Sequence, residues 1–178
     1  TKGRIMLGVG VGWLEEEFDA LGVPFERRGA RTDEYMRALR VLWASDDATF
    51  AGDFVNFDGI SMNPKPHNGT VPLHIGGHST RAARRAGELG DGFFPGKGNL
   101  PELIDVVHQA AAGVGRDATA IEITATHPGM FGDDPVAAVE EAASWGVHRL
   151  VIPAFLFAKQ PDAVNETIPL FMDKLRSS

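Results

Sequence analysis

Two glycine-rich segments contain the residue types best suited to hold a ligand. The first, residues 8–13 (GVGVGW), follows an apolar run and precedes a helix-compatible stretch. Its G-x-G-x-G spacing departs from the G-x-G-x-x-G dinucleotide fingerprint, and no strand ending in an acidic residue follows about 20 residues later to bind a ribose. Repeated glycines let a flat ring approach the backbone, with Trp13 as a wall. A tight turn that buries Trp13 in the core explains these residues equally well.

The second segment, residues 75–80 (IGGHST), lies where a predicted strand ends and a helix begins. Its glycines let the backbone approach an anion, and a helix N-terminus offers unpaired N–H groups at the positive end of the helix dipole. Ser79 or Thr80 can cap the helix or add a hydroxyl to the site. The pattern predicts a phosphate site, or alternatively a capped helix without a ligand. A basic helix face that could also clamp an anion follows, formed by Arg81, Arg84 and Arg85.

No other pattern in the sequence predicts a catalytic or metal site. The six histidines are scattered, and Gly76-Gly77 between His74 and His78 breaks the helix that an H-x-x-x-H zinc site would need. His127 follows a predicted strand and would face the active end of a barrel. The chain has no cysteine, no G-x-S-x-G elbow and no Walker loop. The sequence therefore predicts no metal and leaves the catalytic residue unknown.

The composition describes one ordinary globular domain. The 178 residues include 17 Lys and Arg against 24 Asp and Glu, for a net charge of −7, and 43% are hydrophobic. This acidic balance argues against a nucleic-acid partner, which needs a basic surface. The sequence contains no run of about 18 apolar residues, so it predicts no membrane span. With no cysteine in the chain, we expect a cytoplasmic protein.

Short apolar runs alternate with helical patterns five times along the chain. Strands are expected at residues 2–12, 71–75, 90–95, 121–126 and 149–152. Helices are expected at residues 15–21, 28–43, 80–89, 100–114, 135–145 and 161–175. Residues 48–58 alternate around Gly52-Asp53, which predicts an inserted β-hairpin. The order predicts an α/β fold, with a parallel sheet covered by helices.

Five such units cannot close an eight-unit barrel, which needs about 250 residues. The remaining choices are an open doubly wound sheet or part of a barrel. An uncovered edge strand of a parallel sheet would expose unpaired N–H and C=O groups. We therefore expect either a longer polypeptide that continues before Thr1 or a second copy that covers the edge, as in a homodimer.

Three segments in this order, LGVGVGWLEEEFDALGVPFERRGARTDEY, GDFVNFDGISMNPKP and PLHIGGHSTRAARRAGELGDGFFP, resemble the bacterial-luciferase-like monooxygenase superfamily in its F420-dependent oxidoreductase branch. The resemblance implies a TIM (β/α)8 barrel, of which residues 1–178 would form about the last five βα units with the hairpin inserted. It further implies an oxidoreductase or monooxygenase that transfers a hydride between F420, or alternatively FMN, and a small organic substrate. The alternative is a truncated, non-catalytic protein that binds a flavin or a partner.

The resemblance also implies which residues form the cofactor site. The family's cofactor-binding positions correspond to Gly8, Gly10, Gly12, Trp13, Gly76, Gly77, His78 and Ser79. Phe93 or Phe94 would line the pocket. Val11 stands where sugar-phosphate-oxidising members carry a glutamate, so that substrate class is not expected. The first three strands of the family have no counterpart in this sequence.

Overall fold

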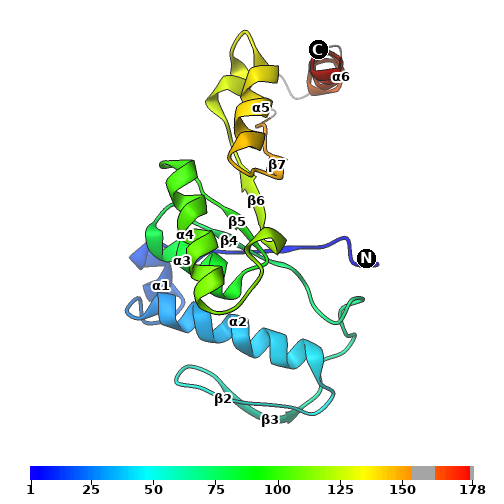
Figure 1. The fold of residues 1–178 in the computed structure, drawn as a ribbon. Helices are drawn as coiled ribbons and strands as arrows, with labels where there is room; N and C mark the ends of the chain where they lie inside the picture. Colours follow the sequence, from blue (N-terminus) through cyan, green and yellow to red (C-terminus); the bar gives the residue numbers. More distant parts are fainter. Residues whose placement is uncertain (154–162, 177–178) are drawn as a thin grey trace.

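A five-stranded parallel sheet forms the centre of the molecule (Figure 1). The computed structural model describes residues 1–153 and 163–176. The strands lie in the order β1 (Leu7–Val9), β4 (Leu73–Gly76), β5 (Gly92–Phe94), β6 (Glu122–Ala125) and β7 (Arg149–Leu150). All four neighbouring pairs are parallel, which confirms the predicted α/β class. Within the described residues β1 and β7 are the two edges, and the sheet does not close into a barrel.

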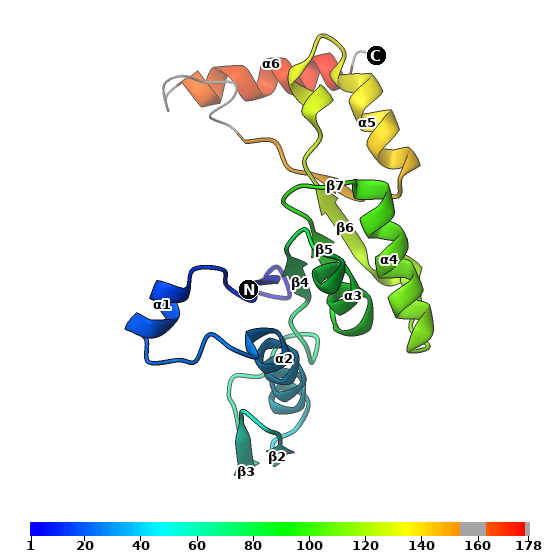
Figure 2. The same cartoon turned by 90° about the vertical axis from the view of Figure 1, so that its left-hand side faces the viewer.

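Helices cover one face of this sheet, as Figure 2 shows for α3 and α4. The helices are α1 (Glu15–Ala20), α2 (Arg28–Ala44), α3 (Thr80–Leu89), α4 (Leu100–Gly113), α5 (Pro135–Ser144) and α6 (Val164–Arg176), with 3-10 turns at Ala118–Ala120 and Pro128–Phe131. Their bounds follow the prediction closely, although the expected start of the last helix, residues 161–162, lies outside the described residues. In the described ranges, no helix is both long and apolar enough to cross a membrane.

Alternate residues of each strand face opposite sides of the sheet. Leu73, Ile75 and Phe93 are fully buried and form a core with the small and branched residues of α3 and α4. Their neighbours His74 and Phe94 face the other side, where they line a pocket. The helix-covered face is therefore the hydrophobic core, and the opposite, open face carries this pocket.

The first and last strands are shorter than predicted. Residues 2–12 are predicted to form a buried strand that ends in a tight glycine loop, but β1 covers only Leu7–Val9, and Ile5, Met6 and Leu7 are exposed. As an edge strand, β1 has a neighbour on one side only and so buries less apolar surface than a central strand. At the other edge, β7 ends at Leu150 rather than at residue 152.

The hairpin lies beside α2, away from the main sheet (Figure 1). Strands β2 (Ala48–Ala51) and β3 (Asn56–Ile60) pair antiparallel, and the rings of Phe50 and Phe57 stack with centroids 5.8 Å apart. Residues 52–55 connect the strands, so the loop is four residues long rather than a two-residue turn at Gly52-Asp53. The longer loop follows from a tertiary contact, because its backbone N–H groups donate to the Glu34 carboxylate of α2.

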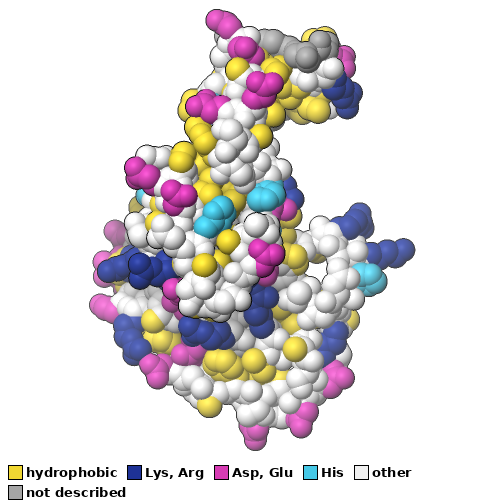
Figure 3. Space-filling model, viewed as in Figure 1, with side chains coloured by type: hydrophobic (Ala, Val, Ile, Leu, Met, Phe, Trp, Pro, Cys, Tyr) yellow, Lys and Arg dark blue, Asp and Glu magenta, His cyan; other side chains and the backbone are white. Residues whose placement is uncertain are grey.

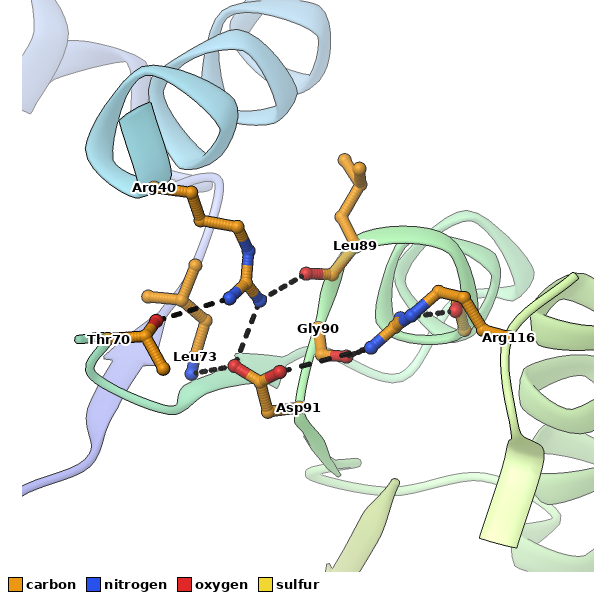
Figure 4. A network of polar contacts seen from close by, with 8 residues as sticks. Arg40, Thr70, Leu73, Leu89, Gly90, Asp91 and Arg116 are labelled. Atoms are coloured by element: carbon orange, nitrogen blue, oxygen red, sulfur yellow. Dashed lines mark hydrogen bonds and ion pairs between the residues drawn. The ribbon is translucent and has the colours of Figure 1, made fainter. Parts of the chain in front are cut away.

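A polar network fixes the amino ends of β4 and β5 (Figure 4). The Asp91 carboxylate accepts hydrogen bonds from the Leu73 N–H at 2.8 Å and from Arg40 of α2 at 2.9 Å. Arg40 also donates to the Leu89 carbonyl at 2.9 Å, and Arg116 donates to the carbonyls of Gly87 and Gly90, both at 2.6 Å. The network joins α2, α3 and two strands at the end of the sheet opposite the glycine segments.

Candidate functional site

A groove of about 1050 Å³ lies at the carboxyl ends of β1 and β4, between the first turns of α2 and α3. It brings together seven of the eight residues that the sequence predicts as cofactor-binding: Gly10, Gly12, Trp13, Gly76, Gly77, His78 and Ser79. The eighth, Gly8, lines an adjoining pocket of about 410 Å³ on the open face of the sheet. Gly10 and Gly76 line both spaces, so the groove and the pocket meet at these two glycines.

The first glycine segment lies open to the groove. A Cβ built on Gly8 or on Gly10 would have no heavy atom within 4 Å, so both positions leave free space above the backbone. Gly12 has a left-handed backbone (φ 78°), and a Cβ there would lie 2.6 Å from the Phe18 ring of α1. Trp13 is 82% exposed, which excludes the alternative in which its ring is buried in the core. It stands at the wall of the groove.

The second glycine segment leads into a capped helix. Gly77 has φ 127°, and a Cβ there would lie 2.9 Å from Cβ of Ala82. Of the two predicted caps, Ser79 precedes the helix, and its Oγ accepts a hydrogen bond from the Ala82 N–H at 3.2 Å. The first turn of α3 lines the groove, and most N–H groups of a first helical turn have no partner within the helix. The segment can thus present backbone donors to an anion.

Four arginines form a basic rim along the groove: Arg27, Arg28, Arg81 and Arg85. The side chains of Lys and Arg gather where α1, α2 and α3 meet, as Figure 3 shows. Arg27 pairs with Asp53 of the hairpin tip at 2.7 Å, and Arg85 pairs with Asp33 of α2. Arg28 donates to the Gly12 carbonyl at 3.1 Å and stacks on the Phe25 ring. No Asp or Glu is among the groove's lining residues in the part of the chain that the structure describes.

Sequence reasoning found only half of this rim. Arg81 and Arg85 are part of the predicted basic face, whereas Arg84 of the same face does not line the groove. Arg27 and Arg28 were not proposed, because nothing local to Glu26-Arg27-Arg28 shows that the start of α2 lies beside the start of α3. Their position at the start of a predicted helix was the one signal that could have suggested an anion site.

The adjoining pocket is mostly apolar and lies on the open face of the sheet. Met6, Val9, Phe94 and Val151 are among its lining residues, whereas Phe93, the other aromatic residue predicted for the pocket, is fully buried in the core. The His74 imidazole packs over Gly92, where a Cβ would lie 2.4 Å from its Cε1. On the same face, Arg149 of β7 pairs with Glu122 of β6 at 2.9 Å.

His127 does not line the groove or the adjoining pocket. It is buried, and its Nδ1 accepts a hydrogen bond from the Gly129 N–H at 3.1 Å. Its Nε2 lies 3.3 Å from the Glu141 carboxylate, and its ring packs on Trp145. Both ring nitrogens therefore have protein partners, which is the arrangement of a histidine that caps a 3-10 turn.

Comparison with known proteins places these observations in a family. The sequence model described as luciferase-like monooxygenase matches residues 1–170. An F420-dependent glucose-6-phosphate dehydrogenase of Mycolicibacterium smegmatis is 34% identical over 182 residues, which cover 97% of this chain and 51% of that protein. An FMNH2-dependent dimethylsulfone monooxygenase of Pseudomonas fluorescens is 38% identical over 120 residues, covering 63% of this chain and 32% of that protein. This chain thus spans about half, or less, of these relatives.

Solved structures share the fold. A monooxygenase from Streptomyces bottropensis superposes with a TM-score of 0.79 and 19% identity, covering 99% of this chain and 69% of the other. An F420-dependent secondary alcohol dehydrogenase superposes with a TM-score of 0.60 and 24% identity, covering 98% of this chain and 55% of the other. The predicted luciferase-like α/β fold is confirmed.

Proposed function

Because this chain belongs to the luciferase-like monooxygenase family, we propose that it forms the C-terminal part of a TIM barrel in an oxidoreductase that binds F420, or alternatively FMN. The reaction would be hydride transfer between this cofactor and a small organic substrate. The cofactor would supply the hydride chemistry when bound, and the protein would supply binding and orientation. The observation that carries the proposal is the junction of the arginine-lined groove with the apolar pocket at Gly10 and Gly76.

The residues present fit a flat ring joined to a phosphate. The free space above Gly8 and Gly10 lets a ring lie against the backbone, with Trp13 and Phe94 as aromatic walls. The first turn of α3 and the basic rim would hold the phosphate, since backbone N–H groups and arginines are its usual ligands. Gly77 would let the backbone approach the phosphate at this turn.

The relatives support F420 first and FMN second. The Mycolicibacterium relative, which is named for F420, matches over 97% of this chain, whereas the Pseudomonas fluorescens relative, which is named for FMNH2, matches over 63%. A sugar-phosphate substrate is not proposed, because Val11 stands where the resemblance places a glutamate in the members that oxidise sugar phosphates. The alternative of a non-catalytic protein has less support, because these relatives are named as enzymes.

A fluorescence titration of F420 and of FMN, side by side, tests the proposal. We expect Gly10→Leu to weaken cofactor binding at least tenfold, because its side chain would occupy the free space where the ring is proposed to lie. Gly113→Leu is the matched control, since Gly113 also has free space above it but lies at the end of α4, outside both sites. If the gene encodes residues before Thr1, the longer chain is titrated as well. Binding of neither cofactor by any version would overturn the proposal.

A further inference from the structure

The tip of the β2–β3 hairpin, residues 52–55, lies next to the basic rim of the groove. We propose that Asp53 of this tip is a built-in counter-ion, which pairs with Arg27 when the groove holds no anion and competes with an anionic ligand for the same guanidinium. Glu34 is the positioning residue that holds Asp53 in place. The inference rests on the proposed function only in that the ligand of the groove carries a negative group.

The Arg27–Asp53 pair has the geometry of an exchangeable contact. Arg27 Nη2 lies 2.7 Å from Asp53 Oδ2, and the two side chains are 62% and 68% exposed. Exposed ion pairs contribute little to stability, because water screens both charges. The Arg27 guanidinium also lies over the Phe54 ring, 4.6 Å from its centroid, and Arg27 is itself a lining residue of the groove. A competing anion in the groove could therefore take Arg27 at low cost.

The backbone that carries Asp53 is, by contrast, firmly held. Oε2 of Glu34 accepts a hydrogen bond from the Asp53 N–H at 2.8 Å, and Oε1 accepts from the N–H groups of Phe54 and Val55 at 2.6 and 2.7 Å. The Glu34 side chain is buried, and a Cβ on Gly52 would lie 2.3 Å from its carboxyl carbon. Only the Asp53 side chain is left to move, so the negative charge stays within reach of Arg27.

The backbone of Arg27 is fixed in the same way. The Arg31 guanidinium donates to the carbonyls of Pro24 at 2.7 Å and Glu26 at 3.3 Å, which holds the segment before α2. Arg27 itself has a left-handed backbone with φ 56°. The two partners are thus presented to each other by two rigid supports, 26 residues apart in sequence.

The other ion pair of the rim, between Arg85 and Asp33, is less exposed than the Arg27–Asp53 pair. Arg85 and Asp33 are 11% and 28% exposed, and a second hydrogen bond of 3.4 Å joins them. This partly buried pair is part of the contact between α2 and α3. Of the two paired arginines on the rim, Arg27 has the more exposed partner. A ligand would therefore pair with the Arg27 guanidinium by displacing Asp53.

The test compares Asp53→Asn with Asp58→Asn in the full chain. Both variants remove one negative charge from the hairpin, but the Asp58 carboxylate accepts a hydrogen bond from the Thr49 hydroxyl and does not pair with Arg27. Each protein is titrated with F420, with FMN and with inorganic pyrophosphate, the last followed by the intrinsic tryptophan fluorescence, to which the exposed Trp13 of the groove contributes. We expect Asp53→Asn to bind the anion about two- to fivefold more tightly than the parent, the range that an exposed ion pair allows. Asp58→Asn should bind like the parent.

A second variant shows whether Arg27 mediates the effect. In an Arg27→Gln background, Asp53→Asn should leave affinity unchanged, whereas a general change in surface charge would still raise it. If the parent binds a cofactor and Asp53→Asn binds it no better, the counter-ion is refuted while the proposed function stands. If no protein binds either cofactor, the proposed function fails, and the pyrophosphate titration alone tests whether Asp53 is a counter-ion. Tighter pyrophosphate binding by Asp53→Asn than by the parent supports this role, and equal binding refutes it.

Discussion

At the scale of single residues, the Glu34 carboxylate is buried and accepts hydrogen bonds from three backbone N–H groups of the hairpin tip. Burial alone raises the pKa of Glu34, but hydrogen bonds from the N–H groups of Phe54, Val55 and Asp53 outweigh this effect and lower it. A lowered folded-state pKa means that the carboxylate stabilises the fold above the pKa it has in the unfolded chain. This stabilisation is lost as the pH falls through the lower folded-state pKa.

We therefore expect the stability of the parent to fall below about pH 4.3, the ordinary glutamate pKa in an unfolded chain, partly because Glu34 becomes protonated. Glu34→Gln should be less stable than the parent at neutral pH and should lose less stability on acidification. Urea denaturation at several pH values measures both effects. Glu140→Gln, on the exposed face of α5, is the control and should follow the parent throughout. Parallel pH curves for Glu34→Gln and the parent would contradict this role.

At the scale of elements, the junction of β4 and α3 combines a structural task with a proposed binding task, and two substitutions separate them. Ser79→Ala removes the helix cap and should cost about 1 kcal/mol of stability, with a smaller effect on cofactor affinity. Ser79→Asp keeps a good cap but adds a negative charge at the groove, so it should remain stable and bind cofactor at least tenfold more weakly. Denaturant melts and cofactor titrations of both variants are the measurements. If Ser79→Asp binds the cofactor like the parent, the proposed phosphate site at this turn is wrong.

The elements also show how far sequence reasoning reaches. Apolar periodicity and glycine or proline boundaries predicted β4, α3 and α4 closely, because those signals are local to each segment. The same reasoning missed the four-residue hairpin loop, which depends on Glu34 in a different element. It also missed Arg27 and Arg28, whose place on the rim depends on how α2 packs beside α3. Glycine spacing predicted most of the groove, and tertiary packing supplied the rest.

At the scale of the whole molecule, the two ends of the sheet have different roles. The glycine segments lie at the carboxyl ends of the strands, and the Asp91 network lies at the amino ends (Figure 4). In barrels of this type, the first end carries function and the second carries stability. Asp91→Ala leaves the N–H of Leu73 without its acceptor and should cost about 1–3 kcal/mol. Thermal and urea melts should show this loss while cofactor affinity changes less than twofold; a large loss of affinity at full folding would contradict the separation.

The exposed edge gives a second prediction at this scale. Ile5 and Met6, just before β1, and Leu7, its first residue, have exposed apolar side chains, and β1 has a free edge in the described chain. We expect the 178-residue chain to associate through this edge, so that its melting temperature rises with protein concentration. Ile5→Lys should weaken the association by placing a charge at the edge. A cooperative melt of a monomer that is independent of concentration would contradict this expectation.

Two adjacent residues of β5 face opposite sides of the sheet, because Phe93 is buried against the helices while Phe94 lines the pocket of the open face. Inserting or deleting one residue before Phe93 would exchange the two rings between the faces of the sheet, and so would damage the core and the pocket together. A substitution at Phe94 changes the pocket alone. The pocket can therefore be reshaped through the side chain at this position, whereas the length of this strand cannot change without damage to the core.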